Sequence, residues 1–234
     1  MAHSEDFERY WLGKLSRCLA DIAGDGVRDQ VMAGSGNLSD GSDRGAIIAW
    51  TQGAMSRLEA LVGHAVAQEA MLGCACQYPV HDLQAARQGY LKTGTVDSAH
   101  CILQAQFESF LVDVLGLDDE MVGEVVSRGW GLAGVRDGDR ILATKIPKSG
   151  YLAAYLRETD PERRRRIYCH CPRVRDALQR GATLPAVYCY CGAGYYKGIW
   201  ETILEQRVRV EVLESVLAGG DVCTVAIHLP SQEG

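Results

Sequence analysis

The sequence contains no apolar segment that approaches the roughly 20 residues needed to span a bilayer. Residues 1–6 also lack the basic-then-apolar layout of a secretory signal. Basic residues are not in excess either, since 24 Lys and Arg against 30 Asp and Glu give a formal net charge of -6. Nucleic-acid binding depends mainly on phosphate neutralisation by a basic face. We therefore expect a cytoplasmic protein with no nucleic-acid partner and no membrane partner.

Common catalytic signatures are missing as well. No serine lies in a nucleophile-elbow pattern, and no two histidines have the spacing of zinc proteases. Gly192 and Gly194 form only half of a phosphate-binding turn, because the third glycine and a preceding long strand are absent. The sequence therefore disfavours serine hydrolases, zinc proteases of that type and nucleotide sites.

Apolar residues at helical spacing predict a mainly helical first half in this chain of 234 residues. The predicted helices span residues 6–23, 46–72, 81–91, 98–115 and 118–128. Asp43 is the predicted cap of the second helix. Residues 34–45 are rich in Gly, Ser, Asn and Asp, which predicts a flexible linker between the first helix and the rest.

The last third shows shorter and more mixed patterns. We predict a strand at 140–146, extended segments at 167–169 and 187–189, and helices at 149–156, 172–180 and 195–205. Alternation within 208–214 and 222–229, with Gly219-Gly220-Asp221 between them, predicts an antiparallel hairpin.

These patterns together predict an α/β fold of the α+β type, in which a helical N-terminal half is followed by a small antiparallel-sheet domain. The predicted divisions are an N-terminal helix and linker at 1–45, a mainly helical region at 46–138 and a cysteine-rich α/β region at 139–234. The alternative is that 46–234 form one domain.

Nine cysteines are many for a chain of this length in a reducing compartment, where thiols indicate metal binding, catalysis or redox sensing rather than disulfides. Six of them form three pairs separated by one residue: Cys74 and Cys76, Cys169 and Cys171, and Cys189 and Cys191. Two such thiols point the same way from an extended segment. Two facing segments would form a four-sulfur site suited to zinc or, less favoured here, an iron–sulfur cluster.

The positions of two thiols favour the thiolate form. Cys171 precedes Pro172 and Cys191 precedes Gly192, each near a predicted helix start, where backbone N–H groups lower the pKa of a thiol. His170 is either a metal ligand or a hydrogen-bonded neighbour. Cys171 or Cys191 with His170 or His228 as base could also form a nucleophilic catalytic site. The remaining alternative is that the thiols only pack as small apolar groups.

Tyrosines cluster around the same thiols. Tyr190 and Tyr195, with three neighbours at 168, 188 and 196, have apolar rings with polar tips that can line a pocket for an aromatic ligand. They can equally form the edge of a core. Tyr190 and Tyr195 are our candidates for contact with a bound molecule.

Residues 184–229 resemble the 4-vinyl reductase domain family. The resemblance rests on Cys189 five residues before Gly194-Tyr195, on Gly198, on the 208–214 strand and on Cys223 before an alternating strand. It implies an α/β domain similar to a trafficking-particle subunit, and it implies a homodimer.

In sensory members of that family a zinc ion is bound at positions that correspond here to Cys189, to Glu211 or Glu214, and to Cys223. The fourth position falls on Ser215, which is a poor zinc ligand, so neighbouring thiols would have to replace it. The predicted metal ligands are Cys169, Cys171, Cys189, Cys191 and Cys223.

The sequence thus favours a zinc-braced homodimeric domain that binds a small apolar or aromatic molecule. The alternative is a cysteine- or metal-dependent enzyme that acts on a small organic substrate through the same thiols.

Overall fold

The computed structural model describes residues 6–230, and these residues form two compact units. The first unit comprises the chain up to Cys76 together with Cys171–Gly194, and the second comprises Gln77–His170 together with the chain from Tyr195 onward. The chain therefore leaves the first unit and returns to it. The boundaries of these units differ from the divisions predicted at 45/46 and 138/139. Local composition does not show which segments contact each other when they are about a hundred residues apart in the sequence.

The first unit is helical. Its elements are α1 (Phe7–Ala23), α2 (Asp25–Met32), α3 (Arg44–Gly73), α9 (Pro172–Gln179), the short helix η4 (Ala186–Cys189) and the first residues of α10 (Tyr190–Leu204). The Asp43 carboxylate accepts a hydrogen bond from the Ala46 N–H at 2.9 Å, which confirms the predicted cap of α3. Gly63, with φ of 74°, breaks α3 into two helical segments. Leu15, Leu19 and Met55 are fully buried in the core of this unit.

The segment predicted as a flexible linker is hydrogen-bonded to α1. The two carboxylate oxygens of Asp40 accept hydrogen bonds from the backbone N–H groups of Phe7 and Glu8, each at 2.9 Å. The Asp40 N–H donates in turn to the Asp6 carboxylate at 3.0 Å. The first N–H groups of a helix lack hydrogen-bond acceptors within the helix. Asp40 supplies these acceptors from the loop, as an N-cap residue does from the end of a helix.

Replacement of Asp40 by alanine is expected to lower the free energy of unfolding by about 1 kcal/mol, as for loss of a helix N-cap. Chemical denaturation would measure the loss. Asp40→Asn keeps one oxygen acceptor but places its NH2 donor opposite the other N–H group, so it should retain only part of the stability. An unchanged unfolding midpoint for Asp40→Ala would show that these hydrogen bonds do not stabilise the fold.

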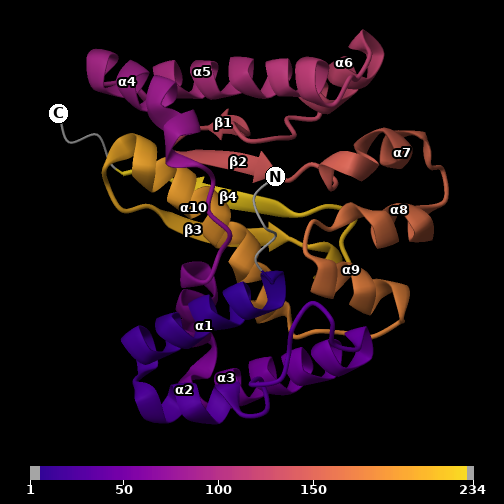
Figure 1. Ribbon diagram of the computed structural model, residues 1–234. Coiled ribbons are helices and arrows are strands. Elements are labelled where there is room, and N and C mark those ends of the chain that lie inside the picture. The colour runs from indigo at the N-terminus through magenta and orange to yellow at the C-terminus, as the bar shows by residue number, and fades with distance from the viewer. Residues whose placement is uncertain (1–5, 231–234) are drawn as a thin grey trace. The chain divides into compact units, whose positions relative to one another are not determined.

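The second unit combines helices with a sheet. Its helices are η1 (Val80–Leu83), α4 (Gln84–Thr93), α5 (Val96–Ser109), the π-helical turn η2 (Phe110–Val114), α6 (Asp119–Ser127), η3 (Ser149–Tyr151), α7 (Leu152–Arg157), α8 (Pro161–Tyr168), the rest of α10, and η5 (Val216–Ala218). Its strands are β1 (Val135–Asp137), β2 (Arg140–Thr144), β3 (Arg209–Glu214) and β4 (Thr224–His228). In Figure 1, α4, α5 and α6 follow one another along the β1 side of the sheet.

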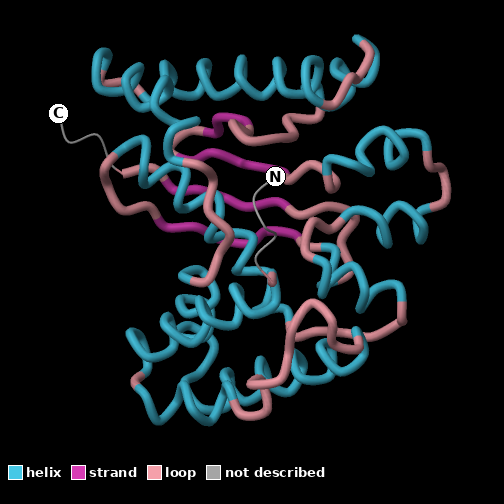
Figure 2. The backbone as a smooth tube through the Cα atoms, in the orientation of Figure 1, coloured by secondary structure: helices cyan, strands magenta, loops and turns pink. Residues whose placement is uncertain are grey.

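The four strands form one antiparallel sheet in the order β1-β2-β4-β3, and Figure 2 shows them next to one another. The predicted hairpin is confirmed, since β3 pairs with β4 with Val210 opposite Ile227 and a register shift between Val212 and Glu214. Strand β2 pairs with β4 from a distant part of the chain, with Ile141 opposite Ile227. The three-residue strand β1 was not predicted, because so short a segment shows no periodicity.

Three predicted segments differ in the structure. Residues 167–168 end α8 instead of forming a strand, because Asp160 caps that helix and Pro161 begins it. Residues 187–189 belong to η4, and α10 begins at Tyr190 rather than at 195. Runs of three residues cannot distinguish an extended segment from a helical turn by periodicity.

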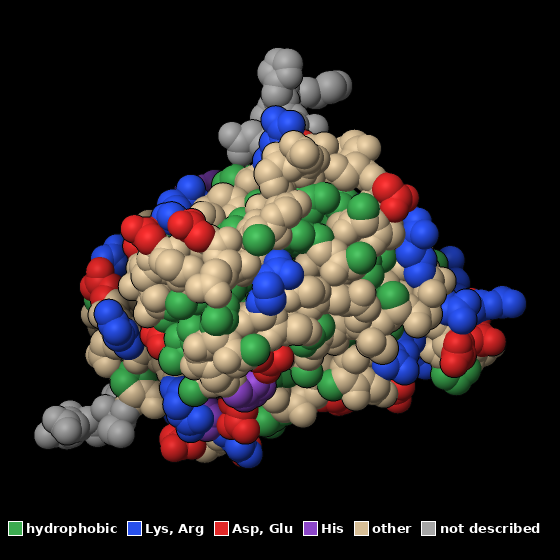
Figure 3. Space-filling view, turned by 90° about the horizontal axis from the view of Figure 1, so that it is seen from below, with side chains coloured by type: hydrophobic (Ala, Val, Ile, Leu, Met, Phe, Trp, Pro, Cys, Tyr) green, Lys and Arg blue, Asp and Glu red, His purple; other side chains and the backbone are tan. Residues whose placement is uncertain are grey.

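The described chain is mostly helical with a small four-stranded antiparallel sheet, so the predicted α+β class is confirmed at that level. Within residues 6–230, no helix is both long and apolar enough to cross a bilayer. Figure 3 shows one face of the surface, on which apolar side chains form small groups.

Candidate functional site

A cavity of about 150 Å³ lies within the second unit. Its lining residues are Tyr78, Gln106, Phe107, Phe110, Gly131, Leu132, Lys145, Ile146, Ser149, His170, Tyr195 and Tyr196. Five of them are aromatic and only one, Lys145, carries a full charge at neutral pH. An apolar, ring-lined cavity with a few polar groups is the usual form of a small-molecule site.

Two helices and a loop bring the rings together. The Tyr195 and Tyr196 rings lie 5.5 Å apart edge-to-face on α10, and the Tyr78 ring lies 6.1 Å from Tyr195 in the same type of arrangement. Phe107 comes from α5 and packs against Gly131, whose φ is 120°. A side chain at Gly131 would overlap the Phe107 ring, so the glycine allows this wall of the cavity to form.

The Tyr196 hydroxyl is held inside the unit. It donates a hydrogen bond to the Gly131 carbonyl oxygen at 3.3 Å. Burial raises the pKa of Tyr196 well above its usual value, and the neighbouring Tyr195 raises it further. Tyr196 is therefore a neutral, fixed wall of the cavity.

Lys145 places a positive charge at the apolar wall. Its Nζ lies 5.3 Å from the centroid of the Tyr195 ring, an arrangement that attracts the cation to the ring face. Lys145 is half-buried. No carboxylate within residues 6–230 lies within ion-pair distance of its ammonium group. The cavity thus holds a cation whose charge the surrounding side chains leave unbalanced.

His170 is the second polar group of the cavity. Its Nε2 lies 3.0 Å from the Ile146 carbonyl oxygen, which can only accept, so Nε2 carries the proton. Burial and, to a smaller extent, the Lys145 charge lower the pKa of His170 to about 4. His170 is therefore a neutral imidazole held by the backbone. This arrangement does not favour the role of general base for a thiol, because the ring binds a proton poorly near neutral pH.

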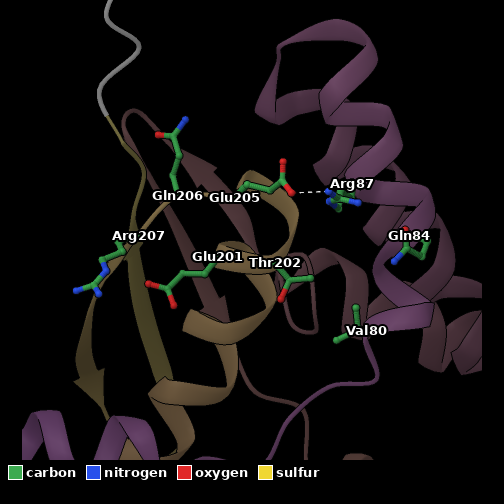
Figure 4. Close-up of a pocket in the computed structure, with 8 residues that line it drawn as sticks. All are labelled: Val80, Gln84, Arg87, Glu201, Thr202, Glu205, Gln206 and Arg207. Carbon is green, nitrogen blue, oxygen red and sulfur yellow. Dashed lines mark hydrogen bonds and ion pairs between the residues drawn. The ribbon is translucent and has the colours of Figure 1, made fainter. Parts of the chain in front are cut away.

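A second, more open cavity of about 530 Å³ lies between α4 and the end of α10. Figure 4 shows the Glu205 carboxylate directed at the Arg87 guanidinium, and the two form an ion pair. Glu205 has a φ of 54°, a left-handed conformation that is uncommon for residues other than glycine. Because this groove is polar and its Arg87 charge is balanced within the chain, the ring-lined cavity is the better candidate for an apolar ligand.

The predicted metal thiols of the second unit are Cys169 and Cys223. Cys169 follows the last residue of α8. The Cys223 N–H donates to the Tyr168 hydroxyl at 2.9 Å, and burial raises the pKa of the Cys223 thiol. A neutral, buried thiol is a poor metal ligand until it loses its proton.

The other three predicted thiols lie in the first unit. Cys171 directly precedes α9, at the helix start that the sequence predicted, and its Sγ lies 3.2 Å from the Tyr188 hydroxyl. Cys189 ends η4, and Cys191 lies in the first turn of α10 with its Sγ 3.9 Å from the Cys74 carbonyl oxygen.

In the described part of the chain, no group of three or more His, Cys, Asp or Glu side chains is arranged to hold a metal ion. The zinc and iron–sulfur predictions therefore gain no support from the described side chains.

Only some of the cavity residues were predicted from the sequence. Of the two tyrosine candidates, Tyr195 lines the cavity and Tyr190 does not. Lys145, Tyr78 and Phe107 were not predicted. The sequence did contain one signal for Lys145. It is a charged residue between an apolar strand and the apolar residues Ile146-Pro147.

Comparison with known proteins adds one partial match. A family of unknown function (DUF6144) matches residues 160–233, about a third of the chain, from α8 to the end of β4 and beyond. No curated protein and no solved structure matches the chain. The matched family has no assigned activity, so the assignment of function depends on the site itself.

Proposed function

We propose that this protein is a binding module for a small aromatic anion, which occupies the ring-lined cavity of the second unit. The observation that carries the proposal is the Lys145 ammonium group, which lies against the Tyr195 ring without a carboxylate partner in the described chain. A single-ring carboxylate or phenolate would satisfy both the apolar walls and this charge.

The volume of the cavity limits the ligand. A closed apolar cavity of about 150 Å³ accommodates one benzene ring, and the cavity here has about that volume. Aromatic rings prefer offset or edge-to-face contacts with one another, and Tyr78, Tyr195 and Phe107 offer such edges. Fused-ring compounds would require the walls to move.

The charge of Lys145 selects among ligands of this size. A half-buried ammonium group gains more from an ionic partner than an exposed one, because the surrounding apolar rings exclude water. His170 contributes no charge near neutral pH, so the cavity carries a single positive charge. Anionic rings should therefore bind more tightly than neutral rings of equal size.

Isothermal titration calorimetry with benzoate and with benzyl alcohol tests the proposal. The protein should bind benzoate more tightly, and Lys145→Met should weaken benzoate about tenfold or more, since a hydrogen bond to a charged group contributes about 1.5–3 kcal/mol. Benzyl alcohol should be affected much less. Lys148→Met is the matched control, because Lys148 is exposed and lies outside the cavity lining. Equal affinities of wild type and Lys145→Met for benzoate would contradict the proposal.

We also propose that the region 139–234 is similar to a 4-vinyl reductase domain and that the protein forms a homodimer. The residue pattern of 184–229 and the antiparallel β3–β4 hairpin support the first proposal. Size-exclusion chromatography with light scattering tests the second. Zinc binding by the predicted thiols stays a prediction, which about one zinc per chain in elemental analysis of protein purified without chelator would support.

A further inference from the structure

Two thiols from distant parts of the sequence meet in the first unit. Cys74 ends α3, and Cys191 lies in the first turn of α10, 117 residues later. The Cys191 Sγ lies 3.9 Å from the Cys74 carbonyl oxygen, and the two thiols are also hydrogen-bonded to each other. In the sequence, Cys74 is paired by spacing with Cys76, and Cys191 with Cys189. The proximity of Cys74 to Cys191 therefore comes from the tertiary structure.

A glycine allows the two backbones to approach. A side chain at Gly194, one turn after Cys191, would overlap the carbonyl oxygen of Leu72 and approach the Ala75 side chain. The absence of a side chain at Gly194 thus lets α10 lie directly against the end of α3. Close backbone approach is a requirement for a disulfide, because the bond spans only a few ångströms between the two Cα atoms.

The two thiols differ in exposure. Cys74 is fully buried, and its Sγ lies 3.2 Å from the Met71 carbonyl oxygen. Its hydrogen bond with Cys191 and its burial raise the pKa of the Cys74 thiol. Cys191 is only half-buried, so a small oxidant in solution reaches Cys191 first. This asymmetry assigns Cys191 as the attacking sulfur and Cys74 as the resolving sulfur.

A buried cation lies beside the pair. The Lys14 side chain is 8% exposed, and its Nζ donates to the Ala75 carbonyl oxygen. No carboxylate in the described chain lies within ion-pair distance of Lys14, whereas its charge acts on both Cys74 and Cys18. A thiolate or a sulfenate formed here would have a cation within the same buried region.

We propose that Cys74 and Cys191 form a reversible redox pair that a peroxide converts into a disulfide within the first unit. The Cys191 thiolate attacks one oxygen of hydrogen peroxide, which breaks the O–O bond and gives a sulfenic acid and hydroxide. The Cys74 sulfur then attacks the Cys191 sulfur, the S–O bond breaks, and the oxygen leaves as water. In total, two thiols and one peroxide give one disulfide and two waters. A small-molecule thiol reverses the reaction by thiol–disulfide exchange.

Peptide mapping after peroxide treatment tests the proposal on the full-length protein. Trypsin releases residues 58–87, which contain Cys74 and Cys76, and residues 181–197, which contain Cys189 and Cys191. After alkylation under non-reducing conditions, mass spectrometry should find these two peptides joined with the loss of two hydrogens. A reducing agent should separate them.

Single substitutions identify the sulfurs that form the bond. Cys76→Ser and Cys189→Ser are matched controls on the same two peptides and should keep the cross-link, whereas Cys74→Ser and Cys191→Ser should abolish it. Cys191→Ser is the decisive variant if loss of the buried Cys74 thiol disturbs folding. The proposal is overturned if the wild-type peptides stay separate after peroxide treatment, or if the cross-link persists in Cys191→Ser. Neither result bears on ligand binding in the other unit.

Discussion

Glu8→Gln is expected to lower the free energy of unfolding by about 3–5 kcal/mol, the loss that follows when one partner of a buried ion pair is removed. Glu8 and Arg173 are both fully buried, and they form a salt bridge in which the Arg173 Nε lies 2.8 Å from the Glu8 carboxylate. The second Glu8 oxygen accepts from the Arg44 Nη1 at 2.9 Å. One carboxylate thus balances two guanidinium groups from α3 and α9.

The cost is large because Arg173 has no route to solvent. Its guanidinium lies 3.8 Å from the centroid of the Trp11 ring and is fully buried. Its Nη1 already has no hydrogen-bond partner in the described chain. With a neutral glutamine at position 8, the positive charge of Arg173 would remain buried without an opposite charge. Urea denaturation followed by tryptophan fluorescence would measure the effect.

Two further variants separate charge from packing. Asp176→Asn also removes a carboxylate partner of Arg44, at 2.5 Å, but this pair is partly exposed and should cost about 1 kcal/mol or less. The double substitution Glu8→Leu with Arg173→Met removes both charges and should be less destabilising than Glu8→Gln alone. If the free energy of unfolding of Glu8→Gln lay within about 1 kcal/mol of the wild-type value, the buried ion pair would not contribute much to the stability of the first unit.

Acidification should destabilise the protein through His170, by up to about 3 kcal/mol between pH 6.5 and pH 4. Burial lowers the pKa of His170 from 6.5 to about 4 in the folded protein. Between these two values the unfolded chain binds a proton that the folded protein excludes, so the stability contributed by His170 is present at neutral pH and is lost as the pH falls through this window.

His170→Gln isolates this contribution. Glutamine does not titrate, and its amide can still donate a hydrogen bond to the Ile146 carbonyl oxygen. The stability difference between pH 7 and pH 4.5 should therefore be smaller in His170→Gln than in the wild type by about 2–3 kcal/mol. His81→Gln is the control, since the His81 side chain is 83% exposed. Identical pH profiles for wild type and His170→Gln would contradict the burial of a neutral imidazole.

Local signals in the sequence were sufficient for much of the secondary structure. Asp43 as a cap and Pro172 at a helix start act on residues one to four positions away, so their effect can be inferred without the fold. Alternation in β3 and β4 likewise predicted their hairpin. Three of the failures, at 167–169, 187–189 and β1, are segments of three residues, which are too short for a period to be recognised. The eight-residue helices α2 and α8 were not predicted either.

The candidate site was predicted in outline but not in its decisive residue. Clustering of tyrosines near position 195 predicted an aromatic pocket, and Tyr195 and Tyr196 do line the cavity. The charge at that cavity comes from Lys145, which belongs to a different part of the chain. A sequence pattern identifies which residues are near one another along the chain, whereas a binding site depends on which residues are near one another in space.

The sequence alone thus determined the helical first half, the terminal hairpin and the caps, because these depend on hydrogen bonds and periodicities within a few residues. Only the tertiary structure decided that Glu8 meets Arg173, that Lys145 meets Tyr195 and that Cys74 meets Cys191 rather than its neighbour in the sequence. Such pairs depend on how helices and strands pack, and packing is set by shape and burial summed over the whole unit.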